Sequence, residues 1–156
     1  MGAISEFMGR DHERLDALLA ELRTPAAATR AKELFARFDA GLRAHIVWEE
    51  EIFFPAFEEK TGMRSMGPTA VMRMEHETIK QLLQAIAQAV ETSAPTDSAD
   101  TLAEVLSAHN LKEENVLYPA LDQVLPVEEA SVLLARIQRA AELSPGGRSS
   151  AALTIS

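Results

Sequence analysis

The chain carries the stretch HIVWEEEIFFP at residues 45–55 and a second version of it, HNLKEENVLYP, at residues 109–119. Each version places a glutamate four residues after its histidine: His45 with Glu49, and His109 with Glu113. On an α-helix, residues i and i+4 lie above one another on the same face. Each stretch therefore predicts a helix that offers one imidazole nitrogen and one carboxylate oxygen to a single point.

The remaining two of the chain's four histidines follow the same period. His12 and His76 each lie 33 residues before the histidine of one of these pairs, and the second half repeats the first after 64 residues. Apolar residues at 15, 18, 19 and 22 recur at 79, 82, 83 and 86. The spacing i, i+3, i+4, i+7 is typical of one face of a helix. The chain is thus predicted to form two helical hairpins of common design.

Short connections between long amphipathic segments favour antiparallel neighbours. We therefore predict an all-α fold, an up-down-up-down antiparallel four-helix bundle with an additional C-terminal helix. The expected helices are Ile4–Leu22, Ala27–Phe54, Pro68–Thr92, Ala99–Leu117 and Pro126–Leu143. Pro55 is expected to bend or end the second helix, because proline has no amide hydrogen, and the fourth helix is expected to stop near Pro119.

The two histidines of a hairpin lie at unequal distances from its turn. His12 precedes the first turn by about 12 residues and His45 follows it by about 21, at a rise of about 1.5 Å per residue. The surplus must be absorbed by the connection or by a stagger of the helices.

One domain is expected over residues 1–143, followed by a disordered tail at 144–156 that begins SPGGRSS. Residues 1–7 precede a second methionine, Met8, and are interpreted as a possible added leader in front of a native start. The N-terminus lacks the basic and apolar regions of a secretory signal, and the longest apolar run is too short to span a membrane. A cytoplasmic location without membrane contact is expected.

Composition narrows the classes of function. The net charge is −9, and no basic stripe interrupts it, so nucleic acid is not an expected partner. There is no cysteine, which excludes disulfides, thiolate zinc sites, iron–sulfur ligation and thiol catalysis by this chain. This composition also fits a reducing compartment.

The repeated residues predict a metal site with six ligands: His12, His45, Glu49, His76, His109 and Glu113. Four buried imidazoles and two buried carboxylates without a cation would be costly to desolvate. Two carboxylates able to bridge suit a pair of ions about 3.5–4 Å apart. Imidazole and carboxylate fit iron or manganese, whereas structural zinc favours four ligands and often sulfur. The expected cofactor is two iron ions with an oxo or hydroxo bridge; manganese and zinc are less favoured.

Other residues near these six have simpler interpretations. Two methionines are expected to pack in the core: Met8 and Met72. Three acidic residues are interpreted as surface charges: Glu50, Glu51 and Glu114. Glu75 is interpreted as a solvated charge, with support of the site or cation entry as the alternative. Tyr118 either donates a hydrogen bond to the site or packs at the bundle end, and Trp48 belongs to the core or to an interface.

The pattern from Met8 to Leu121 resembles the hemerythrin-like family, including its His-His-Glu cation-binding domains. The resemblance implies a four-helix bundle around a non-haem di-iron centre, with Glu49 and Glu113 as bridging carboxylates and the four histidines as terminal ligands. It leaves open how the histidines pair with each iron. A ferritin-type site is not indicated, because its Glu-x-x-His pattern is absent. The residues three before the histidines are Gly9, Leu42, Arg73 and Leu106.

The chain departs from the five-histidine pattern that the resemblance implies for oxygen carriers, since Met72 and Lys80 lie four residues from His76. The resemblance therefore favours binding of or reaction with O2, NO or peroxide, in oxidative or nitrosative stress, with an electron donor that the sequence does not identify. Members tied to iron–sulfur repair have a cysteine-bearing N-terminal segment, and this chain contains no cysteine. Catalytic turnover is left open. The alternatives are an iron-dependent sensor or binding module, or an iron donor without turnover.

Overall fold

The computed structural model describes residues 1–143, and the tail expected at 144–156 lies outside the described residues. The described part consists of helices joined by short connections, without strands, which confirms the all-α prediction. Its elements are α1 (Ala3–Leu22), α2 (Ala28–Trp48), η1 (Glu49–Phe53), α3 (Phe54–Thr61), α4 (Pro68–Thr92), α5 (Ser98–Lys112), η2 (Glu113–Leu117), α6 (Tyr118–Val124) and α7 (Val127–Leu143). Among these residues, no helix combines the length and apolar character needed to cross a membrane.

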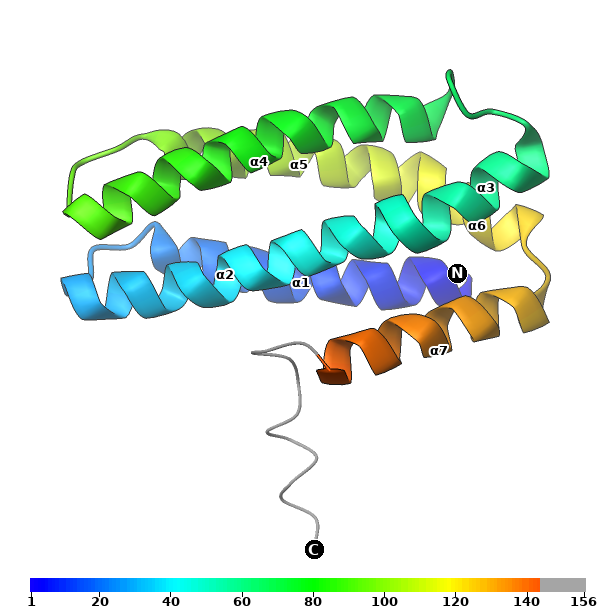
Figure 1. Ribbon diagram of the computed structural model, residues 1–156, viewed down its shortest axis with the longest axis horizontal. Helices are drawn as coiled ribbons and strands as arrows, with labels where there is room; N and C mark the ends of the chain where they lie inside the picture. The colour runs from blue at the N-terminus through cyan, green and yellow to red at the C-terminus, as the bar shows by residue number, and fades with distance from the viewer. Residues whose placement is uncertain (144–156) are drawn as a thin grey trace, which may run out of the picture.

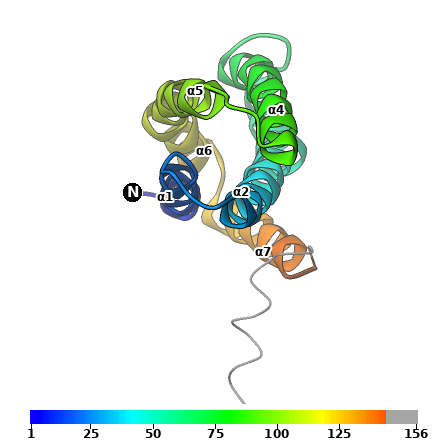
Figure 2. The same cartoon turned by 90° about the vertical axis from the view of Figure 1, so that its left-hand side faces the viewer.

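The long helices lie lengthwise beside one another (Figure 1). Helix α1 packs against α2, and α4 packs against α5. In the end-on view, α1, α2, α4 and α5 surround a common axis, while α7 lies outside this group (Figure 2). Figure 1 also shows that α2 extends beyond the end of α1, and α4 beyond α5. This stagger absorbs the unequal distances of the histidines from their turns.

Neither helix ends at its proline: the prediction that the fourth helix stops near Pro119 was wrong, and of the two outcomes expected at Pro55 a helix end is excluded. Pro55 cannot donate to the carbonyl of Glu51, and its ring would clash with that carbonyl in a regular α-helix. The chain instead forms a π-helical turn, η1, in which the amide of Phe54 donates to the carbonyl of Glu49. The equivalent turn η2 lies before Pro119. Each helix then continues, as α3 and α6, and each π-helical turn begins at a candidate ligand glutamate.

The apolar core consists of two clusters, one on either side of the candidate ligands along the bundle. One cluster includes Met8 and Met72, as predicted, together with Trp48, whose ring lies 6.1 Å from that of Phe7. The other cluster includes Leu15, Leu42, Ile79 and Leu106. On α1 and α4 the candidate ligand lies between the two clusters in sequence: His12 between Met8 and Leu15, and His76 between Met72 and Ile79. Apolar packing therefore separates them from bulk water at both ends.

The start of α1 is fixed by a residue from far along the chain. The carboxylate of Asp122 accepts hydrogen bonds from the amides of Ile4 (2.9 Å) and Ser5 (3.0 Å). A carboxylate at this position satisfies free amides and complements the helix dipole. Ile4 itself is fully buried. The segment before Met8 thus contributes to the fold, and its interpretation as an added leader stays a prediction.

Candidate metal centre

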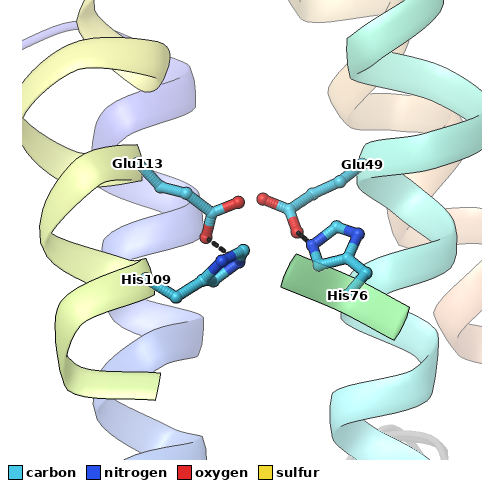
Figure 3. A group of neighbouring side chains, drawn as sticks. All are labelled: Glu49, His76, His109 and Glu113. Atoms are coloured by element: carbon cyan, nitrogen blue, oxygen red, sulfur yellow. Dashed lines mark ion pairs between the residues drawn. The ribbon is translucent and has the colours of Figure 1, made fainter. Parts of the chain in front are cut away.

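The structure brings all six predicted residues together in the interior. The four histidines are at most 3% exposed, and Glu49 and Glu113 are fully buried. They form two groups, in each of which the ligand atoms lie within 4.8 Å of one another: His12, His45 and Glu113, and Glu49, His76, His109 and Glu113. Glu113 is shared by both groups. Figure 3 shows the two carboxylates of the second group facing each other, with His76 and His109 beside them.

Each carboxylate lies between imidazoles from both halves of the repeat. Glu113 Oε1 is 3.2 Å from Nε2 of His12 and 3.4 Å from Nε2 of His109. Glu49 Oε1 is 3.2 Å from Nε2 of His76 and 3.7 Å from Nε2 of His45. The two halves therefore build one site with approximate internal symmetry, in which both carboxylates could bridge between two cations.

The outer nitrogen of every histidine is held by a carboxylate from another helix. These Nδ1 contacts are His12 with Glu114 (3.2 Å), His45 with Asp11 (2.8 Å), His76 with Glu50 (2.7 Å) and His109 with Glu75 (2.9 Å). An ionised carboxylate only accepts hydrogen bonds, so we assign the hydrogen of each neutral imidazole to Nδ1. The Nε2 lone pairs then face the centre, as metal ligation requires.

Two of these carboxylates correct the sequence interpretation. Glu50 and Glu114 were expected to be surface charges. The side chain of Glu50 is only 21% exposed, whereas Glu114 is exposed as predicted, and the carboxylate of each contacts an imidazole. These contacts were not predicted because each joins different helices, which spacing along one helix does not report. Glu51 is exposed, as predicted.

Asp11 was not predicted as part of the site, and Glu75 contacts His109 rather than its neighbour His76. The sequence does contain a signal for both. Asp11 and Glu75 occupy equivalent positions of the 64-residue repeat, as do Glu50 and Glu114. Acidic residues that recur in both halves beside the candidate ligands indicate that these carboxylates help to orient the ligand side chains.

Tyr118 lies at the centre of the first group. Its hydroxyl is 2.8 Å from Glu49 Oε2 and 3.0 Å from Glu113 Oε1, and it is 3.2 Å from Nε2 of both His12 and His45. Of the two interpretations of Tyr118, the structure therefore shows a hydrogen bond to the site. Burial, and after it the neighbouring carboxyl groups of Glu113 and Glu49, raise the pKa of Tyr118 well above its usual value, so the hydroxyl is a neutral phenol in the metal-free chain.

The metal-free centre holds little positive charge around its carboxylates: Glu113 raises the pKa of His12 and of His109 against the effect of burial, whereas burial lowers the pKa of His45 and of His76. Three of its buried atoms make no hydrogen bond: Glu49 Oε1, Glu113 Oε2 and His76 Nε2. Burial and the charge of Glu113 raise the pKa of Glu49. Burial acts on Glu113 in the same direction, but hydrogen bonds with Glu49, His109 and His12 outweigh it and lower the pKa of Glu113. One carboxylate therefore keeps its proton while the other is ionised. Buried oxygen and nitrogen atoms without hydrogen-bond partners fit a bound cation.

The metal-free protein should lose stability in acid through His76. Burial lowers the pKa of His76 from 6.5 to about 4. The folded state therefore favours the neutral imidazole. The contribution of His76 to the free energy of unfolding is complete above pH 6.5 and is lost as the pH falls towards 4. This difference between the ordinary and the folded-state pKa of His76 corresponds to a loss of about 3 kcal/mol of unfolding free energy at most. Urea unfolding of chelator-treated H76Q should show a shallower fall in unfolding free energy over this range than the unsubstituted chain; parallel curves would contradict this assignment.

Removal of a supporting carboxylate should weaken metal binding without removing a ligand. The buried carboxylate of Asp11 orients His45 and also pairs with Arg14. We expect D11A to lower iron affinity by about 10- to 100-fold, measured by competition with a chelator. Glu13 is exposed in the same turn, so E13A is the matched control and should bind as the unsubstituted chain does. Equal affinities of D11A and E13A would show that Asp11 has no such role.

A helical bundle that buries four imidazoles and two carboxylates, with lone pairs facing one another, defines a non-haem metal-binding bundle protein. The chain belongs to the Hemerythrin HHE cation binding domain family, which matches residues 3–121. This confirms the resemblance seen in the sequence.

Curated relatives share part of this domain. The iron-sulfur cluster repair proteins YtfE of Escherichia coli O1:K1 and of Escherichia fergusonii are each 33% identical over 89 residues. The matched region covers 50% of this chain and 40% of each relative, so the chain matches less than half of their length. No solved structure was found to match the chain.

Proposed function

We propose that this chain is a non-haem di-iron protein that binds or reacts with O2, NO or peroxide. His12, His45 and Glu113 would hold one iron, and His76, His109 and Glu49 the other, with Glu113 shared. The bound irons would supply electrons and a free coordination position for a small molecule. The observation that carries the proposal is the set of inward-facing Nε2 lone pairs around buried carboxylate oxygens without hydrogen-bond partners.

The burial of the centre favours very small reactants. The candidate ligands are at most 3% exposed, so a large substrate has no direct contact with them. A groove of about 390 Å³ lies between α1 and α5, and its lining includes Asp16, Asn110 and Glu114. Glu114 also contacts Nδ1 of His12. The groove therefore ends one side chain away from the centre, and a diatomic molecule or peroxide could enter from it.

The rest of the chain would hold this centre rigid. In our proposal the long helices form an up-down-up-down bundle within a domain of residues 1–143, the supporting carboxylates fix the imidazole rings, and the two apolar clusters exclude water. We further propose a cytoplasmic location. We also propose a separate electron donor, because the iron must be reduced again after each reaction.

A second candidate is iron donation without turnover. It is favoured by the printed role of the YtfE relatives, iron–sulfur cluster repair, although this chain matches only 40% of their length. On this alternative the same residues would bind iron and release it to an acceptor protein.

One experiment separates these activities. The iron-loaded, reduced chain is mixed with NO, with hydrogen peroxide or with O2, and the optical spectrum and reactant consumption are followed. Consumption of many equivalents per chain indicates an enzyme, and a single stoichiometric adduct indicates a binding module. Transfer of iron to an acceptor apoprotein indicates a donor. E51A, which alters an exposed neighbour of the site, should behave as the unsubstituted chain does. An iron-loaded chain that is spectrally unchanged by all three reactants would refute the leading proposal.

A further inference from the structure

We propose that the phenol oxygen of Tyr118 is an additional protein ligand at the metal position formed by His12, His45 and Glu113. The inference rests on the metal centre proposed above. It adds a residue to the six predicted ligands, and it makes the two metal positions chemically different.

The first support is the spacing of atoms around the phenol oxygen. Ligand atoms about 2.1 Å from an ion and at right angles to one another lie about 3.0 Å apart. The Tyr118 oxygen lies 2.8 Å and 3.0 Å from oxygens of Glu49 and Glu113, and 3.2 Å from Nε2 of His12 and of His45. Nε2 of His12 and Oε1 of Glu113 are themselves 3.2 Å apart. These are the separations expected for neighbouring ligands of a single ion.

The second support is a count of hydrogens. With the hydrogen of His45 on Nδ1, facing Asp11, its Nε2 atom presents a lone pair to Tyr118, and Oε1 of Glu113 is a second acceptor 3.0 Å from the hydroxyl. The hydroxyl has one hydrogen and can satisfy only one acceptor at a time. Hydrogen bonding by Tyr118 alone therefore does not account for its full set of close contacts, whereas a cation shared by these atoms does.

The third support is a difference between the two halves of the repeat. The position equivalent to Tyr118 is Phe54, whose ring stacks on His76 with centroids 5.8 Å apart and planes at 8°. Phe54 therefore offers no side-chain oxygen beside His76. The position built on His76 and His109 thus lacks the ligand that the other position gains. On ligation the O–H bond of Tyr118 breaks, an oxygen–metal bond forms, and the proton passes to solvent, with no electron transferred.

The unsubstituted chain allows a direct test, because Tyr118 is its only tyrosine. The chain is loaded with iron, oxidised to Fe(III), and studied by visible absorption and resonance Raman spectroscopy. We expect a phenolate-to-Fe(III) charge-transfer band whose enhanced vibrations shift when the protein is grown with ring-deuterated tyrosine. Two bound irons per chain without this band would overturn the inference and leave the proposed centre intact. A chain that binds no iron would overturn both.

The variant Y118F tests the same point from the other side. It removes only the hydroxyl and gives the second half the phenylalanine that the first half already has at Phe54. We expect the charge-transfer band to disappear while at least one iron per chain is retained at the His76–His109 position. Persistence of the band in iron-loaded Y118F would contradict the assignment. The measurement on the labelled, unsubstituted chain does not depend on how well the variant folds.

Discussion

E113A is expected to purify with almost no iron, whereas the unsubstituted chain is expected to purify with two ions. Glu113 belongs to both candidate groups, and its Oε1 atom contacts an imidazole of each, on His12 and on His109. Its removal takes a ligand from both metal positions at once. It also leaves the Nε2 atoms of His12 and His109 without the carboxylate that they contact. Iron per chain after iron-replete expression, determined by elemental analysis, measures the effect.

Two comparisons make this result specific. E51A removes an exposed carboxylate two residues from Glu49 and should keep both irons. H76A removes a ligand that belongs to one group only, so it should retain more iron than E113A. Full iron content in E113A would show that the buried carboxylates do not hold the metal.

Iron loading is expected to raise the melting temperature of the chelator-treated protein by about 10 °C. A ligand that binds only the folded state, and is present at about 1,000 times its dissociation constant, stabilises that state by about 4 kcal/mol. For a chain of this length each kcal/mol corresponds to about 2–4 °C. The metal-free centre contains buried atoms without hydrogen-bond partners, which a cation would satisfy. Thermal unfolding followed by circular dichroism measures the shift.

Mg²⁺ is the control for this experiment. It prefers oxygen ligands and retains its waters, so a centre with four imidazoles should bind it poorly. Stabilisation by Mg²⁺ as large as that by iron would indicate general charge screening of the acidic chain, and no shift with iron would contradict the proposed centre.

Much of the fold could be predicted because local signals agreed with the final packing. Pro68 marks the first turn of α4, and the apolar period placed its end at Thr92, where the structure has it. The signal at Pro55 was ambiguous, since the missing amide is compatible with either a helix end or a π-helical turn. Burial of Phe57 beyond the proline favours continuation of the helix, and this contact depends on the tertiary fold.

The candidate ligands could be predicted because duplication and the i, i+4 spacing lie within single helices. The supporting carboxylates could not, because the pairing of Asp11 with His45 or of Glu114 with His12 joins different helices. The place of Tyr118 depends on η2. In a regular α-helix a residue five positions after Glu113 would be turned about 140° away from it. The π-helical turn reduces this angle, and the hydroxyl of Tyr118 reaches Oε1 of Glu113.

The central claim concerns where two ions lie, and an anomalous difference map at the iron absorption edge tests it most directly. Crystals of the iron-loaded chain should show two peaks in the interior, one beside His12 and His45 and the other beside His76 and His109, both next to Glu113. A single interior peak, or peaks confined to the surface of the bundle, would contradict the account.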